Sequence, residues 1–147
     1  MTDMNAVEIL LVEDNPNNAE LTIRSLKKQN LVNNLYTAKD GAEALDFLFC
    51  RGPYSERATN DALRVVLLDL KLPKVNGLEV LKQIKDEKTL RSIPVVIVTS
   101  SCEDPDVKAA YELGANSYVV KPVGFEAFAE EMSKIGLYWL LVNQPSK

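Results

Sequence analysis

A run of apolar, mostly branched residues at 65–68 is followed at once by an aspartate, Asp69. A strand with one exposed face alternates apolar and polar residues, so an unbroken apolar run indicates a strand buried on both faces. Such strands belong to parallel sheets that helices cover on both sides. A carboxylate at the end of such a strand does nothing for core packing. We therefore expect Asp69 at the carboxyl edge of a parallel sheet, where open α/β folds bind their ligands.

Further strand patterns alternate with helical patterns along the chain. Helix starts are indicated at Asp40 and Asn76, each with a glutamate three residues on as in a capping box, and at Asp104, which precedes a proline. Strands are expected at 8–12, 35–38, 93–98 and 117–120. Strands that alternate with helices in this way predict an α/β fold with a doubly wound, five-stranded parallel sheet and right-handed crossovers.

The last helix is expected to begin near Gly124 and to be longer than a small sheet requires. Its apolar residues recur three and four positions apart, at Phe125, Phe128, Met132, Ile135, Trp139 and Val142. One interpretation is that this whole stripe packs on the sheet. The other is that its outer half, with Tyr138, Trp139 and Leu141, forms a surface for a partner.

Composition narrows the possible classes of function. With 147 residues, of which 46% are hydrophobic and 26% charged, the chain has the size and make-up of one soluble domain. The net charge of −4 and the lack of a basic cluster argue against nucleic acid as a partner. Neither a membrane span nor a signal peptide is apparent, so we expect a cytoplasmic protein without membrane attachment.

The chain contains no histidine. This excludes Ser-His-Asp and Cys-His catalysis and almost every kind of zinc site. The cysteines, Cys50 and Cys102, have neither the number nor the spacing of a disulfide framework.

Polar residues of complementary types follow the buried strands. In a doubly wound sheet these ends converge near one edge, so their side chains are expected to meet. The residues are Glu13, Asp14, Asp69, Thr99, Ser100 and Lys121. Taken singly, an acid or threonine after a strand is often a helix cap and a lysine is often solvated. Together, three carboxylates would repel one another, and a divalent ion such as Mg²⁺ removes that conflict. A lysine and a hydroxyl beside such an ion suit the transfer of a phosphoryl group to a carboxylate.

The sequence resembles the receiver domain of two-component response regulators from Ile9 to about Met132. The motifs that carry the resemblance are residues 11–14 (Leu-Val-Glu-Asp), residues 68–73 with Gly77, residues 98–100 (Val-Thr-Ser) and residues 118–122 (Tyr-Val-Val-Lys-Pro). The resemblance implies a flavodoxin-like fold with strand order 2-1-3-4-5. It also implies that residues 1–147 form a single receiver domain with an extended C-terminal helix and tail at about 124–147, and no output domain.

The resemblance also implies a set of residue roles. Asp69 would accept the phosphoryl group and contribute to a Mg²⁺ (or Mn²⁺) site. Asp14 would bind the ion directly, Glu13 directly or through water, and the backbone carbonyl of Lys71 would complete the protein ligands.

The remaining roles concern the phosphoryl group and the switch. Thr99 would hydrogen-bond the phosphoryl group and Lys121 would pair with it. Tyr118 would be the switch aromatic, turning inward as Thr99 moves, and the bond from Lys121 to Pro122 would be cis.

The function implied is that of a stand-alone response regulator. A sensor histidine kinase would donate a phosphoryl group to Asp69, and the protein would catalyse only its own phosphorylation and slow autodephosphorylation. Output would pass to an unidentified downstream protein through contacts. The long loop at 51–61 and the aromatic tail resemble the small receivers paired with phytochrome-type histidine kinases. In that subgroup the tail and the face of the fourth helix support homodimers. The likeness therefore implies a homodimer through the last helix and neighbouring surface, with Tyr138, Trp139 and Leu141 as candidates.

Other functions fit the residues less well. A phosphatase with an aspartyl nucleophile places an acid two residues later, where this chain has Lys71. This cation is able either to hinder or to recruit the water that attacks an aspartyl phosphate. A flavin-binding module needs a phosphate loop rich in Ser, Thr and Gly after the first strand, and none follows here. A scaffold that keeps the site without being switched by it stays an alternative.

Overall fold

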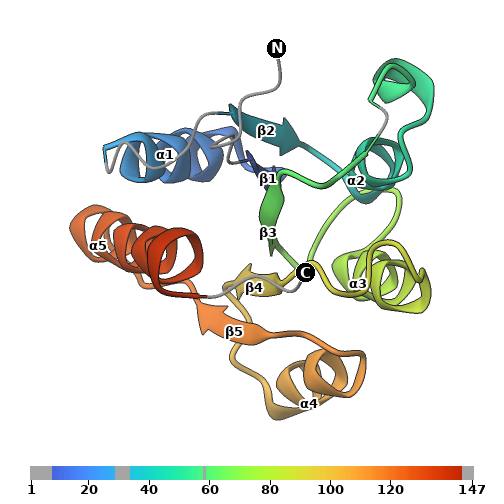
Figure 1. The fold of residues 1–147 in the computed structure, drawn as a ribbon. Helices are drawn as coiled ribbons and strands as arrows, with labels where there is room; N and C mark the ends of the chain where they lie inside the picture. Colours follow the sequence, from blue (N-terminus) through green and yellow to red (C-terminus); the bar gives the residue numbers. More distant parts are fainter. Residues whose placement is uncertain (1–7, 29–33, 58, 144–147) are drawn as a thin grey trace.

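The computed structural model describes residues 8–28, 34–57 and 59–143, and within them five parallel strands form one sheet. The strand order is β2-β1-β3-β4-β5, which confirms the expected class and order (Figure 1). The strands are β1 (Glu8–Val12), β2 (Asn34–Ala38), β3 (Leu63–Leu68), β4 (Val95–Thr99) and β5 (Ser117–Val120). Asp69 therefore follows β3 directly, whereas β4 begins two residues later than expected and includes Thr99.

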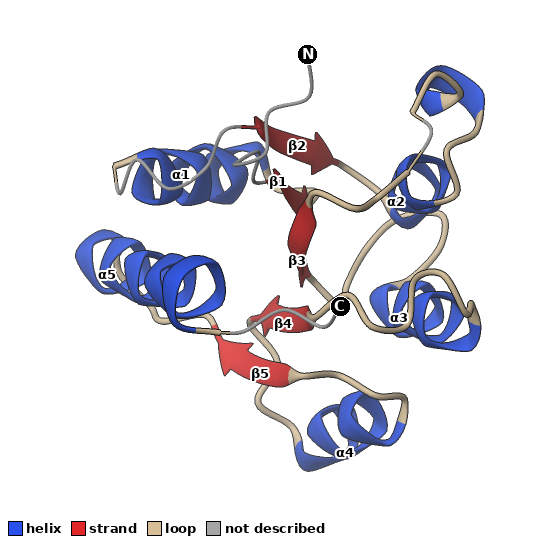
Figure 2. Cartoon of the chain, viewed as in Figure 1, coloured by secondary structure: helices blue, strands red, loops and turns tan. Residues whose placement is uncertain are grey.

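Helices cover both faces of the sheet. As Figure 2 shows, α1 and α5 lie on one face, and α2, α3 and α4 lie on the other. Their bounds are α1 (Pro16–Lys27), α2 (Gly41–Leu48), α3 (Gly77–Asp86), α4 (Asp104–Glu112) and α5 (Phe125–Leu137). A 3₁₀ turn, η1 (Gly52–Tyr54), follows α2, and a π-helical segment, η2 (Tyr138–Val142), continues α5. None of the described helices is long and apolar enough to cross a membrane.

The central strands send alternate side chains into two separate cores. Val66 and Leu68 of β3 join the core beneath α2, α3 and α4, whereas Val65 and Leu67 join the core beneath α1 and α5. This confirms that β3 is buried on both faces. The edge strand β5 differs, because its residues are half-buried or exposed.

The expected capping boxes form only in part. Asp40 Oδ1 accepts the Glu43 N–H at 2.8 Å, and Asn76 Oδ1 accepts the Glu79 N–H at 3.0 Å. In the described structure neither glutamate side chain accepts the N–H of its cap residue, which is the second bond of a capping box. Glu43 accepts from a tyrosine hydroxyl instead, and Glu79 from a glutamine amide. Each helix start is thus fixed by one hydrogen bond from its cap residue.

The start expected for α4 is wrong by one residue. Glu103 precedes the helix and makes no side-chain cap hydrogen bond, and Asp104 is already helical. Val107, Ala110 and Tyr111 recur at helical spacing, but they do not form a buried face. Only Ala110 is buried, and Tyr111 is 50% exposed. Helix α4 is therefore loosely packed on the sheet.

The stripe of the last helix is buried only in its middle. Phe128, Met132 and Ile135 are buried in the core beneath α1 and α5, and Trp139 packs against that core from outside. Phe125, at the first turn, is instead 69% exposed, and Val142, Leu141 and Tyr138 are also exposed. Neither interpretation of the stripe holds as a whole, because Trp139 packs inward while its neighbours face solvent.

Most described residues of the loop at 51–61 are exposed, as its polar composition indicates, but Arg57 packs against the domain. The Arg57 guanidinium lies 3.8 Å from the centre of the Phe47 ring and 3.4 Å from the Glu8 carboxylate. The Arg57 and Glu8 side chains are each 14% exposed. A half-buried cation over an aromatic ring thus fastens this loop to α2 and β1.

Candidate functional site

The register of the sheet brings the predicted site residues together. Val12 pairs with Leu68, so the residues that follow them, Glu13 and Asp69, lie side by side. The Asp69 N–H donates to the Val12 carbonyl at 3.1 Å. On the other side, the N–H of Lys121 donates to the carbonyl of Thr99 at 2.7 Å. The polar strand ends therefore meet at one edge of the sheet, as the sequence predicted.

Lys121 joins the two buried carboxylates. Its ammonium donates to Glu13 Oε1 at 2.5 Å and to Asp69 Oδ2 at 2.8 Å. The side chains of Lys121, Glu13 and Asp69 are 10%, 5% and 9% exposed. Water therefore screens these charges little, and each carboxylate depends on the lysine for compensation.

Burial and charge shift the pKa values of this group in ways that follow from its geometry. Burial raises the pKa of Glu13, and the hydrogen bond from Lys121 only partly offsets this effect. For Lys121, burial lowers the pKa, but the bonds to Asp69 and Glu13 and their charges outweigh it, so the net shift is upward. Lys121 thus stays charged at neutral pH.

Three carboxylates could hold a metal ion. One oxygen each from Glu13, Asp14 and Asp69 lies within 4.8 Å of the others, and Asp14 is exposed whereas the other two are buried. A donor set made only of oxygen suits hard divalent ions such as Mg²⁺ and Mn²⁺. The N–H of Lys71 donates to Asp69 Oδ1 at 3.2 Å, and the Lys71 side chain is exposed.

Thr99 is fully buried at the end of β4, and its hydroxyl has no hydrogen-bond partner in the described parts of the chain. Tyr118 is half-buried, and its hydroxyl donates to the carbonyl of Ser101 at 2.8 Å. Burial raises the pKa of the Tyr118 phenol. The bond between Lys121 and Pro122 is trans, so the cis geometry that the resemblance implied is absent.

Gly77 allows α3 to begin directly against the site. A Cβ atom at this position would lie 2.2 Å from the backbone oxygen of Asp69 and 2.6 Å from the Cα of Leu70. The Gly77 N–H donates to the Leu70 carbonyl at 2.9 Å. No side chain fits here, so the glycine fixes the distance between α3 and Asp69.

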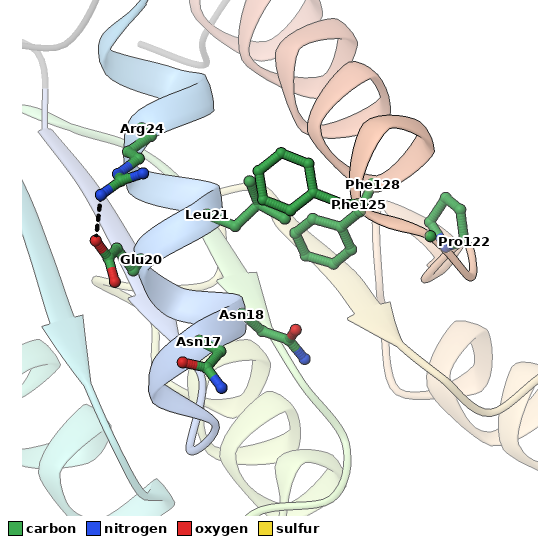
Figure 3. Close-up of a pocket in the computed structure, with 9 residues that line it drawn as sticks. Asn17, Asn18, Glu20, Leu21, Arg24, Pro122, Phe125 and Phe128 are labelled. Carbon is green, nitrogen blue, oxygen red and sulfur yellow. Dashed lines mark hydrogen bonds and ion pairs between the residues drawn. The ribbon is translucent and has the colours of Figure 1, made fainter.

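A groove of about 470 Å³ lies beside this edge, between α1 and the start of α5. Figure 3 shows Leu21 of α1 facing Phe125 and Phe128 of α5, with the ion pair of Glu20 and Arg24 on the outer side of α1. Pro122, the residue after Lys121, is part of its lining. No sequence pattern indicated this groove, because its walls come from opposite ends of the chain.

The sequence profile of the response regulator receiver domain matches residues 9–133. The chain belongs to this family. A probable methanogenesis regulatory protein of Methanothrix harundinacea, FilR2, is 43% identical over 136 residues, which are 92% of this chain and 85% of that protein.

Two further response regulators are also similar to it. The response regulator Rcp1 of Synechocystis is 37% identical over 132 residues, which are 90% of this chain and 88% of that protein. A crystal structure of the Mn²⁺-bound form of Rcp1 superposes with a TM-score of 0.89 at 35% identity and covers 96% of this chain and 99% of that one. The structure of the bacteriophytochrome response regulator AtBRR has 51% identity and a TM-score of 0.72, with 95% and 99% of the two chains covered.

The candidate dimer residues lie apart from the acidic cluster, on η2. Tyr138 and Leu141 are 50% and 64% exposed, whereas Trp139 is half-buried and makes an edge contact with the Tyr138 ring. The sequence patterns did not reveal Ser101, which accepts from Tyr118 and donates to Asp106. No spacing rule would have found that pair, because residues five apart follow no helical period.

Proposed function

We propose that this receiver takes a phosphoryl group on Asp69 from a phosphohistidine of a sensor histidine kinase. The observation that carries the proposal is the contact of one buried ammonium, that of Lys121, with both Glu13 and Asp69. A structural ion pair needs only one carboxylate for each lysine. A second buried carboxylate beside it, with Asp14 at the rim, leaves negative charge that a divalent ion would balance.

The ion would be Mg²⁺ or Mn²⁺, held by Glu13, Asp14, Asp69 and the backbone carbonyl of Lys71. When bound, it supplies positive charge that lowers the repulsion between Asp69 and the incoming phosphoryl group. Oxygen ligands in a site with one exposed carboxylate fit such an ion.

The residues of the chain have separate tasks in the transfer. An oxygen of Asp69 forms a bond to phosphorus while the bond from phosphorus to the histidine nitrogen breaks, and that nitrogen keeps the electron pair. Lys121 remains protonated and holds charge beside the acceptor oxygens. The Thr99 hydroxyl, which has no partner in the described structure, then donates to a phosphoryl oxygen. The resulting aspartyl phosphate is hydrolysed slowly by the same site.

The test is phosphorylation by acetyl phosphate, a donor that requires no kinase. With Mg²⁺ the intact mass should rise by one phosphoryl group, and removal of the ion with a chelator should prevent this. Asp69→Asn should stay unmodified, whereas Asp104→Asn, which changes an exposed acid at the start of α4, should react like the wild type. Equal modification of the wild type and Asp69→Asn would refute the assignment of Asp69.

We further infer that the kinase places a helix in the groove between α1 and α5. The groove adjoins Pro122, next to Lys121, and presents the exposed ring of Phe125. Similarity to the bacteriophytochrome response regulator AtBRR favours a phytochrome-type kinase, and hence a cytoplasmic setting. Phe125→Ala should slow phosphorylation by the kinase and leave the reaction with acetyl phosphate unchanged. A phosphotransfer profile against the histidine kinases of the source organism would identify the donor.

We also propose a homodimer through the last helix and η2, a surface that could equally serve a downstream protein. Four large apolar side chains between Leu137 and Val142 are exposed, and this supports an interface there. Because Trp139 packs against the core, its removal would perturb folding as well as association. Leu141→Ser is the cleaner variant. It should shift sedimentation from dimer to monomer, while Val123→Ser, at a 99% exposed valine outside this surface, should not. Monomeric wild type would contradict the proposal.

A further inference from the structure

The loop between β3 and α3 contains Lys71, and helix α2 packs directly against this loop. Gly41, the first residue of α2, is buried, and a Cβ atom there would overlap the carbonyl oxygen of Val75. The Gly41 N–H donates to the Pro73 carbonyl at 3.4 Å. Helices α2 and α3 lie side by side on the same face of the sheet (Figure 1). The start of α2 therefore sets the path of the loop that leads from Asp69 into α3.

Lys74 has a backbone conformation that is unfavourable for its residue type. Its φ is +66°, in the left-handed region that favours glycine. The N–H of Val75 donates to the carbonyl of Pro73 at 2.8 Å, which closes a three-residue turn around Lys74. A residue other than glycine keeps such a conformation only where its surroundings hold it there. Contacts around Lys74 must therefore hold the loop in this shape.

The ion pair between Lys74 and Asp40 is one such contact. The Lys74 ammonium lies 3.6 Å from Asp40 Oδ2, and the two side chains are 70% and 7% exposed. The other carboxylate oxygen, Oδ1, caps α2 through the Glu43 N–H. Among the described residues, Lys74 is the one cation within ion-pair distance of Asp40. A surface ion pair contributes little, but a buried carboxylate without a partner is costly. Asp40 therefore favours loop conformations that keep Lys74 beside it.

We propose that Asp40 and Lys74 are positioning residues that hold the loop after β3 in the turn that presents the Lys71 carbonyl to a divalent ion. Neither residue would bind the ion itself. The Lys71 N–H donates to Asp69 Oδ1 at 3.2 Å, so the position of this segment and that of the acceptor carboxylate depend on each other. The inference rests on the proposed function, because it assigns a support to the same ion site. It makes the start of α2 part of what sets the affinity for the metal.

The direction of two substitutions distinguishes this support from a simple effect of charge. Lys74→Met removes a cation from the loop of the ion site, so electrostatics alone predicts tighter binding of Mg²⁺. Asp40→Asn removes an anion and keeps an oxygen that caps α2, so electrostatics alone predicts weaker binding. A support that needs both partners predicts weaker binding in both variants. Each should bind Mg²⁺ about five- to tenfold more weakly, because the apparent affinity falls with the fraction of molecules that keep the turn.

Lys74→Gly is the matched control, since it removes the same charge as Lys74→Met. Glycine adopts a φ of +66° without strain, so the turn no longer needs the ion pair. Lys74→Gly should therefore bind Mg²⁺ within about twofold of the wild type. Added to Lys74→Gly, Asp40→Asn should weaken binding much less than it does alone, because the glycine requires no support.

The first measurement is calorimetric titration of the unphosphorylated protein with Mg²⁺ alone. The expected order of affinity places the wild type and Lys74→Gly together, above Lys74→Met and Asp40→Asn. Equal affinity of Lys74→Met and Lys74→Gly would overturn the proposal, and so would tighter binding by Lys74→Met than by the wild type.

The second measurement is hydrogen exchange of the Val75 amide in chelator, which requires neither metal nor phosphorylation. Lys74→Met and Asp40→Asn should exchange about five- to tenfold faster than the wild type, since the turn opens more often, and Lys74→Gly should stay close to it. Equal exchange in Lys74→Met and the wild type would overturn the support, even if Asp69 is phosphorylated normally. Wild type that binds no Mg²⁺ and takes up no phosphoryl group would instead overturn the proposed function. The exchange comparison would then still decide whether Asp40 and Lys74 hold the loop.

Discussion

Replacing Lys121 by methionine tests whether this lysine and a metal ion compensate the same carboxylates. The change keeps an unbranched side chain that reaches nearly as far and removes the charged amino group. Two unit charges 4.8 Å apart repel by about 3.5 kcal/mol at an effective dielectric constant of about 20. Mutational studies of buried ion pairs give a similar figure, since removal of one partner costs about 3–5 kcal/mol. Without metal, Lys121→Met should therefore lose about 3–5 kcal/mol of unfolding free energy.

With saturating Mg²⁺ the loss should be much smaller, because the ion supplies the missing positive charge. By linkage, whatever Mg²⁺ restores in stability appears as tighter binding of Mg²⁺ to the variant. If the ion restores about 1.4 kcal/mol, Lys121→Met binds it about tenfold more tightly than the wild type does. Lys121→Met should thus be less stable than the wild type and bind Mg²⁺ more tightly.

Urea unfolding in chelator and in Mg²⁺ measures both effects. The single tryptophan, Trp139, packs against one of the two cores and reports on unfolding by fluorescence. Lys108→Met is the control, since Lys108 is 78% exposed and its ion pair is a surface pair worth about 0–1 kcal/mol. If Mg²⁺ stabilises Lys121→Met and the wild type equally, Lys121 and the ion do not share these carboxylates.

Three further changes test other parts of the structure. Gly77→Ala would place a methyl group 2.2 Å from the backbone oxygen of Asp69, and it should lower both the urea midpoint and the rate of phosphorylation by acetyl phosphate. Arg57→Met should cost about 2 kcal/mol in urea unfolding because it removes a half-buried cation from an aromatic face. Arg51→Met, at a 56% exposed cation, should cost less than about 1 kcal/mol. Glu13→Gln should be more stable than the wild type at neutral pH in chelator. The raised pKa of Glu13 means that the wild type loses stability as the pH rises from 4.5 through that pKa, so the advantage should vanish at lower pH in urea unfolding.

The sheet and the site edge were predictable because their signals are local. An unbroken apolar run at Val65–Leu68 identifies a doubly buried strand, and the polar residue after each such strand falls at one edge by topology alone. Glu13, Asp69 and Lys121 meet for this reason, although 108 residues separate the first from the last.

Features of helix ends and loops at the periphery of the fold were not predictable in this way. Phe125 and Tyr111 follow the period of their helices, but periodicity does not reveal where a helix extends past the sheet. Arg57 lies in a polar loop, and its burial depends on an aromatic ring ten residues earlier in the chain. The bond from Ser101 to Asp106 depends on the path of a short loop, for which no sequence rule exists.

The contrast between β3 and β5 has a consequence for how the protein would exchange partners. Asp69 follows the central strand, which is held from both faces, whereas β5 is an edge strand and α4 is loosely packed. A phosphoryl group would therefore leave the surface around α1 nearly unchanged and alter the surface around α4. A kinase in the groove beside α1 would bind both forms about equally and be inhibited by its own product, so turnover would depend on a downstream protein that captures the phosphorylated form through α4.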